Sequence, residues 1–147
     1  MESWLYYGLA AALIYGISGF SAKLASGKAH YALQPHVLGI LAAIGVFVVF
    51  FAYYLLEGKG TLSLPSDPSA LGLGLLTGGT WAVATVLVYR AFSEGANASQ
   101  MAPIYNLNTL VVVILGLALL HEIPAAGQAI KVLAGAILIT IGAMLVS

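Results

Sequence analysis

Charged residues are scarce in this sequence. They make up 7% of its 147 residues, as five Lys or Arg and five Asp or Glu, and the formal net charge is zero. Soluble globular domains carry roughly 25% charged residues, which coat their surface. A chain with so few charges cannot form such a coat, and it has no basic excess that would indicate nucleic-acid binding. We therefore expect a membrane protein with no nucleic-acid partner.

Cysteine is also absent, and so are acidic residues within the long apolar runs. Without cysteine the chain has no disulfide framework and no thiolate metal site. The adjacent His121 and Glu122 do not have the spacing of a metal motif, and no nucleophile triad or phosphate-binding loop is present. A buried carboxylate would indicate proton coupling, so its absence argues against simple proton-for-cation exchange. We expect no enzyme activity, no cofactor and no metal.

The sequence is rich in long apolar runs. Hydrophobic residues make up 61% of the chain, and the mean hydropathy is +1.02. Each run has about 20 residues, which is the length that an α-helix needs to cross a bilayer, and none alternates like a barrel strand. The predicted helices cover about 4–25, 35–56, 71–92, 99–120 and 126–146. We expect an all-α membrane protein of the cell membrane, with residues 1–147 forming one bundle of five transmembrane helices.

The connections between the runs are short and carry helix-starting residues. Pro35 can open the second helix. Ser66-Asp67-Pro68 predicts a helix start, because a polar cap precedes a proline in the first turn. No connection is long enough to form a soluble domain.

Small residues recur at helical spacing in three runs. They are Gly8, Ala12 and Gly16, then Gly74, Gly78 and Ala82, and finally Gly135 and Gly142. Such stripes let membrane helices approach closely, which indicates helix packing. A sliding surface or a cavity wall is the alternative.

Polar residues inside the runs are costly in hydrocarbon and therefore informative. Serines and threonines are expected to bond to their own backbone. Asn106 and Asn108 could bond to a neighbouring helix or line a site, and the sequence favours neither. Pro103 would clash with the carbonyl of Ser99, so it predicts either a helix kink or a first turn. Transporters often build a substrate site on such an interrupted polar helix.

The few basic residues show almost no bias between the two sides of the predicted bundle. Lys59 and Lys131 fall on the side of the N-terminus, whereas Lys23, Lys28 and Arg90 fall on the other. Lys23 and Arg90 lie near span ends, where long side chains can reach the interface. A chain with so little bias can insert in both orientations.

The C-terminal part of the chain carries a specific series of motifs. It reads Tyr89-Arg90-Ala91-Phe92, Ser93-Glu94-Gly95-Ala96-Asn97-Ala98-Ser99-Gln100, Ala102-Pro103-Ile104, Leu119-Leu120-His121-Glu122, and then Gln128, Gly135 and Gly142. In order and spacing this series resembles the EamA-type domain of the drug/metabolite transporter superfamily. Tyr15-Gly16, Ser18 and Lys23 resemble the first helix of that domain. His121 stands where the family has glycine, and Phe92 where it has leucine.

The resemblance implies a transporter of amino acids, nucleotide precursors, other metabolites or drugs. Most relatives carry two five-helix domains in one chain, related by an inverted pseudo-two-fold axis, whereas this sequence holds one. We therefore expect a homodimer, with its copies antiparallel in the bilayer. A parallel dimer and pairing with a sister half stay open.

The expected mechanism is alternating access by the dimer to a small-molecule substrate. The candidate lining residues are Tyr15, Ser18, Trp81, Tyr89, Asn106, Asn108 and Thr109. Aromatic walls with a few amides suit a polar or amphipathic molecule. The alternatives are a non-transporting membrane partner subunit and one half of a hetero-oligomeric transporter. A membrane-embedded enzyme is disfavoured because no catalytic group converges within a span.

Overall fold

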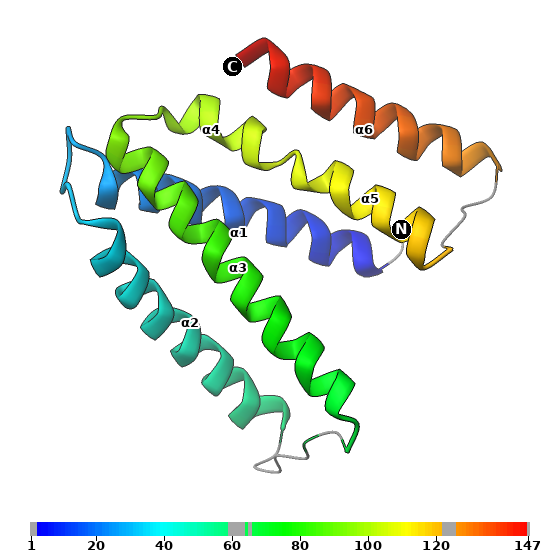
Figure 1. The fold of residues 1–147 in the computed structure, drawn as a ribbon, viewed down its shortest axis with the longest axis horizontal. Helices are drawn as coiled ribbons and strands as arrows, with labels where there is room; N and C mark the ends of the chain where they lie inside the picture. The colour runs from blue at the N-terminus through cyan, green and yellow to red at the C-terminus, as the bar shows by residue number, and fades with distance from the viewer. Residues whose placement is uncertain (1–2, 59–63, 65, 122–125, 147) are drawn as a thin grey trace. The chain divides into compact units, whose positions relative to one another are not determined.

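Figure 1 shows the computed structural model of the chain, which describes residues 3–58, 64, 66–121 and 126–146. Every regular element in these ranges is an α-helix, and five stretches are long and apolar enough to cross a membrane. The helices are α1 (Ser3–Ser26), α2 (Pro35–Glu57), α3 (Pro68–Glu94), α4 (Ala98–Tyr105), α5 (Asn108–Leu119) and α6 (Ala126–Val146). The predicted helical class is confirmed, with α4 and α5 together forming the fourth stretch. Lys59 and Glu122 lie outside the described residues.

Two predicted helix starts are confirmed. Pro35 opens α2. Asp67 caps α3, where its Oδ1 accepts a hydrogen bond from the Ser69 backbone N–H at 2.8 Å. This bond satisfies one of the N–H groups that a helix leaves without a partner in its first turn. As a result α3 begins at Pro68, three residues before the apolar run itself.

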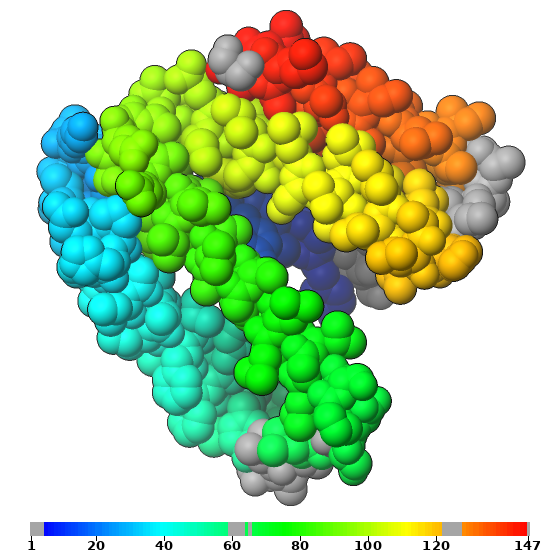
Figure 2. All heavy atoms as spheres, viewed as in Figure 1, coloured from blue at the N-terminus to red at the C-terminus, as the bar shows by residue number. Residues whose placement is uncertain are grey.

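The chain divides into two compact units, Met1–Gly95 and Ala96–Ser147. In the first unit α1, α2 and α3 pack against one another, and in the second α6 packs against α4 and α5. The atoms of α2 and α3 run beside each other in Figure 2. The single five-helix bundle expected from the sequence stays a prediction.

The buried residues of the first unit lie on the C-terminal halves of α1 and α3. Ala22 and Ser26 of α1 are buried, as are Tyr89 and Phe92 of α3. The Ser26 hydroxyl donates to the Ala22 carbonyl at 2.7 Å, so this buried polar group is satisfied. The Lys23 ammonium lies 5.7 Å from the centre of the Phe92 ring, within the range of a cation–π interaction.

In the second unit the buried residues are alanines of α6. Ala136 and Ala143 are buried, and their spacing of two helical turns places them on one face. Gly135 is half-buried and Gly142 is exposed. The close-packing face of α6 therefore lies one residue beyond the glycines that the sequence singled out.

The ends of α3 and α5 both have backbone in the region that favours glycine. Gly95, after α3, has φ 121, and its N–H bonds to the carbonyls of Ala91 and Phe92 at 3.2 Å. His121, just beyond α5, has φ 53. A side chain at such a φ is strained, so His121 occupies a backbone conformation that suits the glycine expected from the resemblance.

Candidate functional site

The fourth apolar stretch is interrupted near its middle. α4 ends at Tyr105 and α5 begins at Asn108. Asn106 lies eight residues into a stretch of 22 residues, which places it about 12 Å from the start at 1.5 Å per residue. Pro103 lies inside α4, so it does not mark the first turn, and the interruption comes three residues after it.

Hydrogen bonds at the interruption have a tighter pattern than those of an α-helix. The N–H groups of Leu107, Thr109 and Leu110 bond to carbonyls three residues back, at 3.0 to 3.1 Å. An α-helix would bond each of them four residues back. The Tyr105 carbonyl therefore loses the Thr109 donor, and the Pro103 carbonyl loses the Leu107 donor.

Proline chemistry adds a third carbonyl to this segment. Pro103 has no N–H, so the carbonyl of Ser99 lacks the donor that the next turn would supply. Three carbonyls within seven residues thus have lost their usual helical donor. In hydrocarbon such groups need another partner, and they are tolerated where they are buried in protein or line a cavity.

The polar side chains of the interruption are exposed. Asn106, Asn108 and Thr109 are all exposed, and the Thr109 hydroxyl donates to Asn108 Oδ1 at a long 3.5 Å. Two amides and several carbonyls therefore lie on one short segment. They can donate and accept hydrogen bonds but supply no charge, so the segment can hold a polar molecule without acid–base chemistry.

The other candidate lining residues lie in the first unit. Tyr15 and Ser18 of α1 are exposed, Trp81 of α3 is 47% exposed, and Tyr89 of α3 is buried. No hydrogen bond or ring contact joins these four side chains within the described ranges. Their assignment to a common site with the fourth stretch stays a prediction.

Serine and threonine hydroxyls inside the helices bond to their own backbone, as predicted. Thr77 donates to the Leu73 carbonyl at 2.8 Å, and Thr85 donates to the Trp81 carbonyl at the same distance. Further bonds of this kind are made by Ser21, Ser26, Thr80 and Thr140. Their polarity is satisfied locally, and it gives no indication of a ligand.

The charged side chains of the first unit lie at the C-terminal ends of its helices. Arg90 Nε lies 3.2 Å from Glu94 Oε1, one turn away on α3, and both side chains are at least 70% exposed. Within the described residues no group of three or more His, Cys, Asp or Glu side chains could hold a metal ion.

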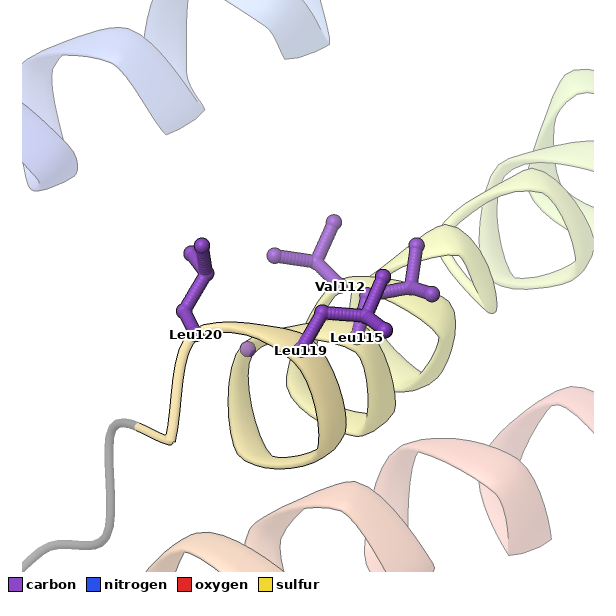
Figure 3. Close-up of a pocket in the computed structure, with 5 residues that line it drawn as sticks. Val112, Leu115, Leu119 and Leu120 are labelled. Atoms are coloured by element: carbon purple, nitrogen blue, oxygen red, sulfur yellow. The ribbon is translucent and has the colours of Figure 1, made fainter.

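Two apolar hollows lie along single helices. One, of about 330 Å³, is lined on α5 by Val112, Leu115, Gly116, Leu119 and Leu120, and the labelled leucines and valine project beside it in Figure 3. The other, of about 720 Å³, follows α3 from Gly72 to Leu87. Neither contains a residue that the sequence singled out as lining a substrate site.

The interruption itself was only half visible in the sequence. Pro103 marked the region, but proline acts on the turn before it, whereas the break falls at Asn106 and Leu107. Asparagine competes for backbone bonds and weakens a helix, and two asparagines around one leucine were the available signal.

No model of a known protein family matches the chain, and no curated protein or solved structure matches it. The resemblance to the EamA-type domain therefore rests on the motif residues quoted above.

Proposed function

We propose that this chain is a multi-pass membrane protein that moves a small molecule by alternating access, as a homodimer whose copies are antiparallel. The observation that carries the proposal is the interruption of the fourth apolar stretch at Asn106 and Leu107. The steps below give its support.

Membrane embedding is supported by the exposure of the apolar side chains. Phe50 is 68% exposed, Leu75 79% and Leu145 81%, each in the body of a long helix. Monomeric soluble proteins rarely expose extended apolar surface. Hydrocarbon removes the cost of this exposure, and the 19 to 27 residues of each stretch match its thickness.

A substrate path is supported by the backbone of the interruption. Unwound carbonyls and amide side chains near mid-membrane are the elements with which transporters bind polar substrates and ions. The carbonyls of Pro103 and Tyr105 and the amides of Asn106 and Asn108 supply both kinds of group. The aromatic residues Tyr15 and Trp81 would supply the apolar part of the wall.

The dimer is supported by the number of stretches. An odd number of crossings makes one copy asymmetric across the membrane, and a path between two repeats needs a second domain. The near balance of basic residues between the two sides is compatible with insertion in both orientations. An antiparallel second copy would supply the inverted repeat.

Uptake by purified protein in liposomes tests the transport part. A panel of labelled amino acids, nucleosides and amphipathic cations is offered to wild type, Asn106→Ala and Trp81→Ala. We expect Asn106→Ala to reduce uptake by up to about tenfold through a lost hydrogen bond. Thr85→Val is the matched control, because its hydroxyl bonds only to the Trp81 carbonyl, and it should retain uptake. A wild-type protein that moves no member of the panel overturns the proposal.

Thiol labelling tests the antiparallel arrangement, because the chain has no cysteine of its own. Ala29→Cys and Ser66→Cys lie at opposite ends of α2 and α3, and both positions are exposed. With a membrane-impermeant reagent, about half of each variant should react from outside if the chain inserts both ways. Full labelling of one variant and none of the other removes the antiparallel dimer and leaves a partner-subunit role.

A further inference from the structure

The basic residues of the first unit gather at one end, although the whole chain has no net charge. Three of the five Lys and Arg residues, Lys23, Lys28 and Arg90, lie where α1 ends and where α3 ends (Figure 1). His30 lies in the connection that follows α1. The acidic residue at this end is Glu94, which is paired with Arg90.

The opposite end of α2 and α3 has the opposite sign within the described residues. Glu57 ends α2 and Asp67 caps α3, and Asp67 already accepts a hydrogen bond from Ser69. The first unit is therefore polarised along these helices. We call the end with Lys23, Lys28, His30 and Arg90 the basic end.

A notch without a side chain lies at the centre of the basic end. A Cβ at Gly27 would lie 2.7 Å from the Lys23 carbonyl oxygen, 3.4 Å from Lys23 Cε and 3.4 Å from His30 Cδ2. The lysine and histidine side chains therefore approach the same bare point of the backbone. The glycine leaves room for both.

The position of the Lys23 ammonium is set by a buried ring. Its Nζ lies 5.7 Å from the centre of the Phe92 ring, and Phe92 is 1% exposed. A packed ring of this kind has one orientation, so it restrains the flexible lysine. The charge is held beside the notch.

The connection after α1 is ordered by its own backbone. The N–H of Tyr31 bonds to the Leu24 carbonyl at 3.3 Å, and the N–H of Leu33 bonds to the Ala25 carbonyl at 2.8 Å. Between these bonds and the helix end, the N–H groups of Lys28 and Ala29 have no acceptor in the described part of the chain. Two side-chain cations and two backbone donors thus surround the notch.

We propose that the basic end binds the phosphate of an anionic phospholipid headgroup. Ammonium groups and free backbone N–H groups are the donors that phosphate oxygens take. A lipid is favoured over a soluble phosphate because the notch lies at the end of an apolar stretch, where headgroups begin. Tyr31, 79% exposed beside His30, has the amphipathic ring typical of residues at headgroup level.

The inference rests on the proposed membrane embedding and not on transport. In an antiparallel pair, each copy would hold one such lipid in the leaflet that its basic end faces. Incorporation of the protein into phosphatidylcholine vesicles is therefore measured first. Failure to incorporate overturns the embedding, whereas incorporation without lipid preference overturns only the headgroup site.

The test is native mass spectrometry of detergent-solubilised protein titrated with phosphatidylglycerol or phosphatidylcholine. We expect wild type to retain phosphatidylglycerol in preference, with affinity falling as salt rises. Lys28→Gln should weaken binding about fivefold, and a Lys23→Gln, Lys28→Gln double variant about 25-fold. Lys131→Gln, which removes an exposed cation of α6, is the matched control and should bind as wild type.

The single variant guards against misfolding, because Lys28 is exposed and lies outside the helices. Equal retention of both lipids by wild type overturns the proposal, and so does equal binding by wild type and the double variant. Displacement of the lipid by inorganic phosphate at comparable concentration would also overturn it, because the site would then select a free anion.

Discussion

α3 and the fourth apolar stretch have similar lengths and a similar mixture of apolar and polar residues, but only α3 is continuous. α3 runs for 27 residues with a capping Asp67 at its start and Gly95 at its end. The fourth stretch is split into helices of eight and twelve residues. Neither Asn97 nor Leu107, which precede those helices, makes a side-chain capping bond.

The difference shows which polar residues an apolar helix can absorb. The threonines of α3 return their hydroxyls to carbonyls of the previous turn, and the helical hydrogen bonds continue. Pro103 removes a backbone donor instead, and Asn106 and Asn108 accompany a local change to the three-residue pattern. Continuity is thus lost where backbone bonding itself is altered, and the three variants below test this.

The largest effect is expected from Pro103→Ala in the fourth stretch. Alanine restores an N–H for the Ser99 carbonyl and removes the ring clash, which together cost up to about 3 kcal/mol in a helix interior. The free energy of unfolding in mixed micelles should rise by roughly 1–3 kcal/mol. Amide hydrogen exchange at Leu107 and Thr109 should become slower. Unchanged exchange at both residues would show that the asparagines alone cause the interruption.

A smaller effect of opposite sign is expected from Gly95→Ala at the end of α3. A Cβ there would meet no atom within 4 Å, so the cost comes from the positive φ alone. We expect a loss of about 1–2 kcal/mol in the free energy of unfolding. Gly78→Ala is the control, since its position is equally open but helical, and it should gain up to about 1 kcal/mol. A loss in both variants would mean that space, and not φ, limits these sites.

The smallest effect is expected from His121→Gly, beyond α5. Because φ is 53 at this residue, glycine should relieve strain and raise the free energy of unfolding by about 0.5–1 kcal/mol. His121→Ala removes the imidazole but keeps the strain, so it should not stabilise the protein. Equal stabilisation by both variants would assign the effect to the imidazole. Together with Gly95→Ala, this pair measures how the two helix ends differ.

Much of the helical structure could be predicted because its causes are local. Runs of about 20 apolar residues exclude other spanning structures, and Pro35 and Asp67 start helices through bonds to their immediate neighbours. The bonding of threonines to their own backbone is local for the same reason. The candidate lining residues could be named from polarity and the resemblance, but polarity does not say which of them meet.

Three features needed the folded chain. The break at Asn106 and Leu107 lies after the proline that indicated it, because it depends on which carbonyl each N–H reaches. The close-packing face of α6 is formed by Ala136 and Ala143, which share a spacing with the glycines beside them, so the pattern could not distinguish the two rows. The pairing of Lys23 with Phe92 joins residues far apart in sequence.

The sequence alone thus determined the helical class, the five apolar stretches and most of the helix starts. These follow from side-chain polarity and from hydrogen bonds within one turn, which each segment carries wherever it lies. Only the tertiary structure decided the point at which the fourth stretch breaks, the face on which α6 packs and the convergence of Lys23 and His30 on Gly27. Those outcomes depend on distances between atoms of different turns and different helices, which composition and spacing do not specify.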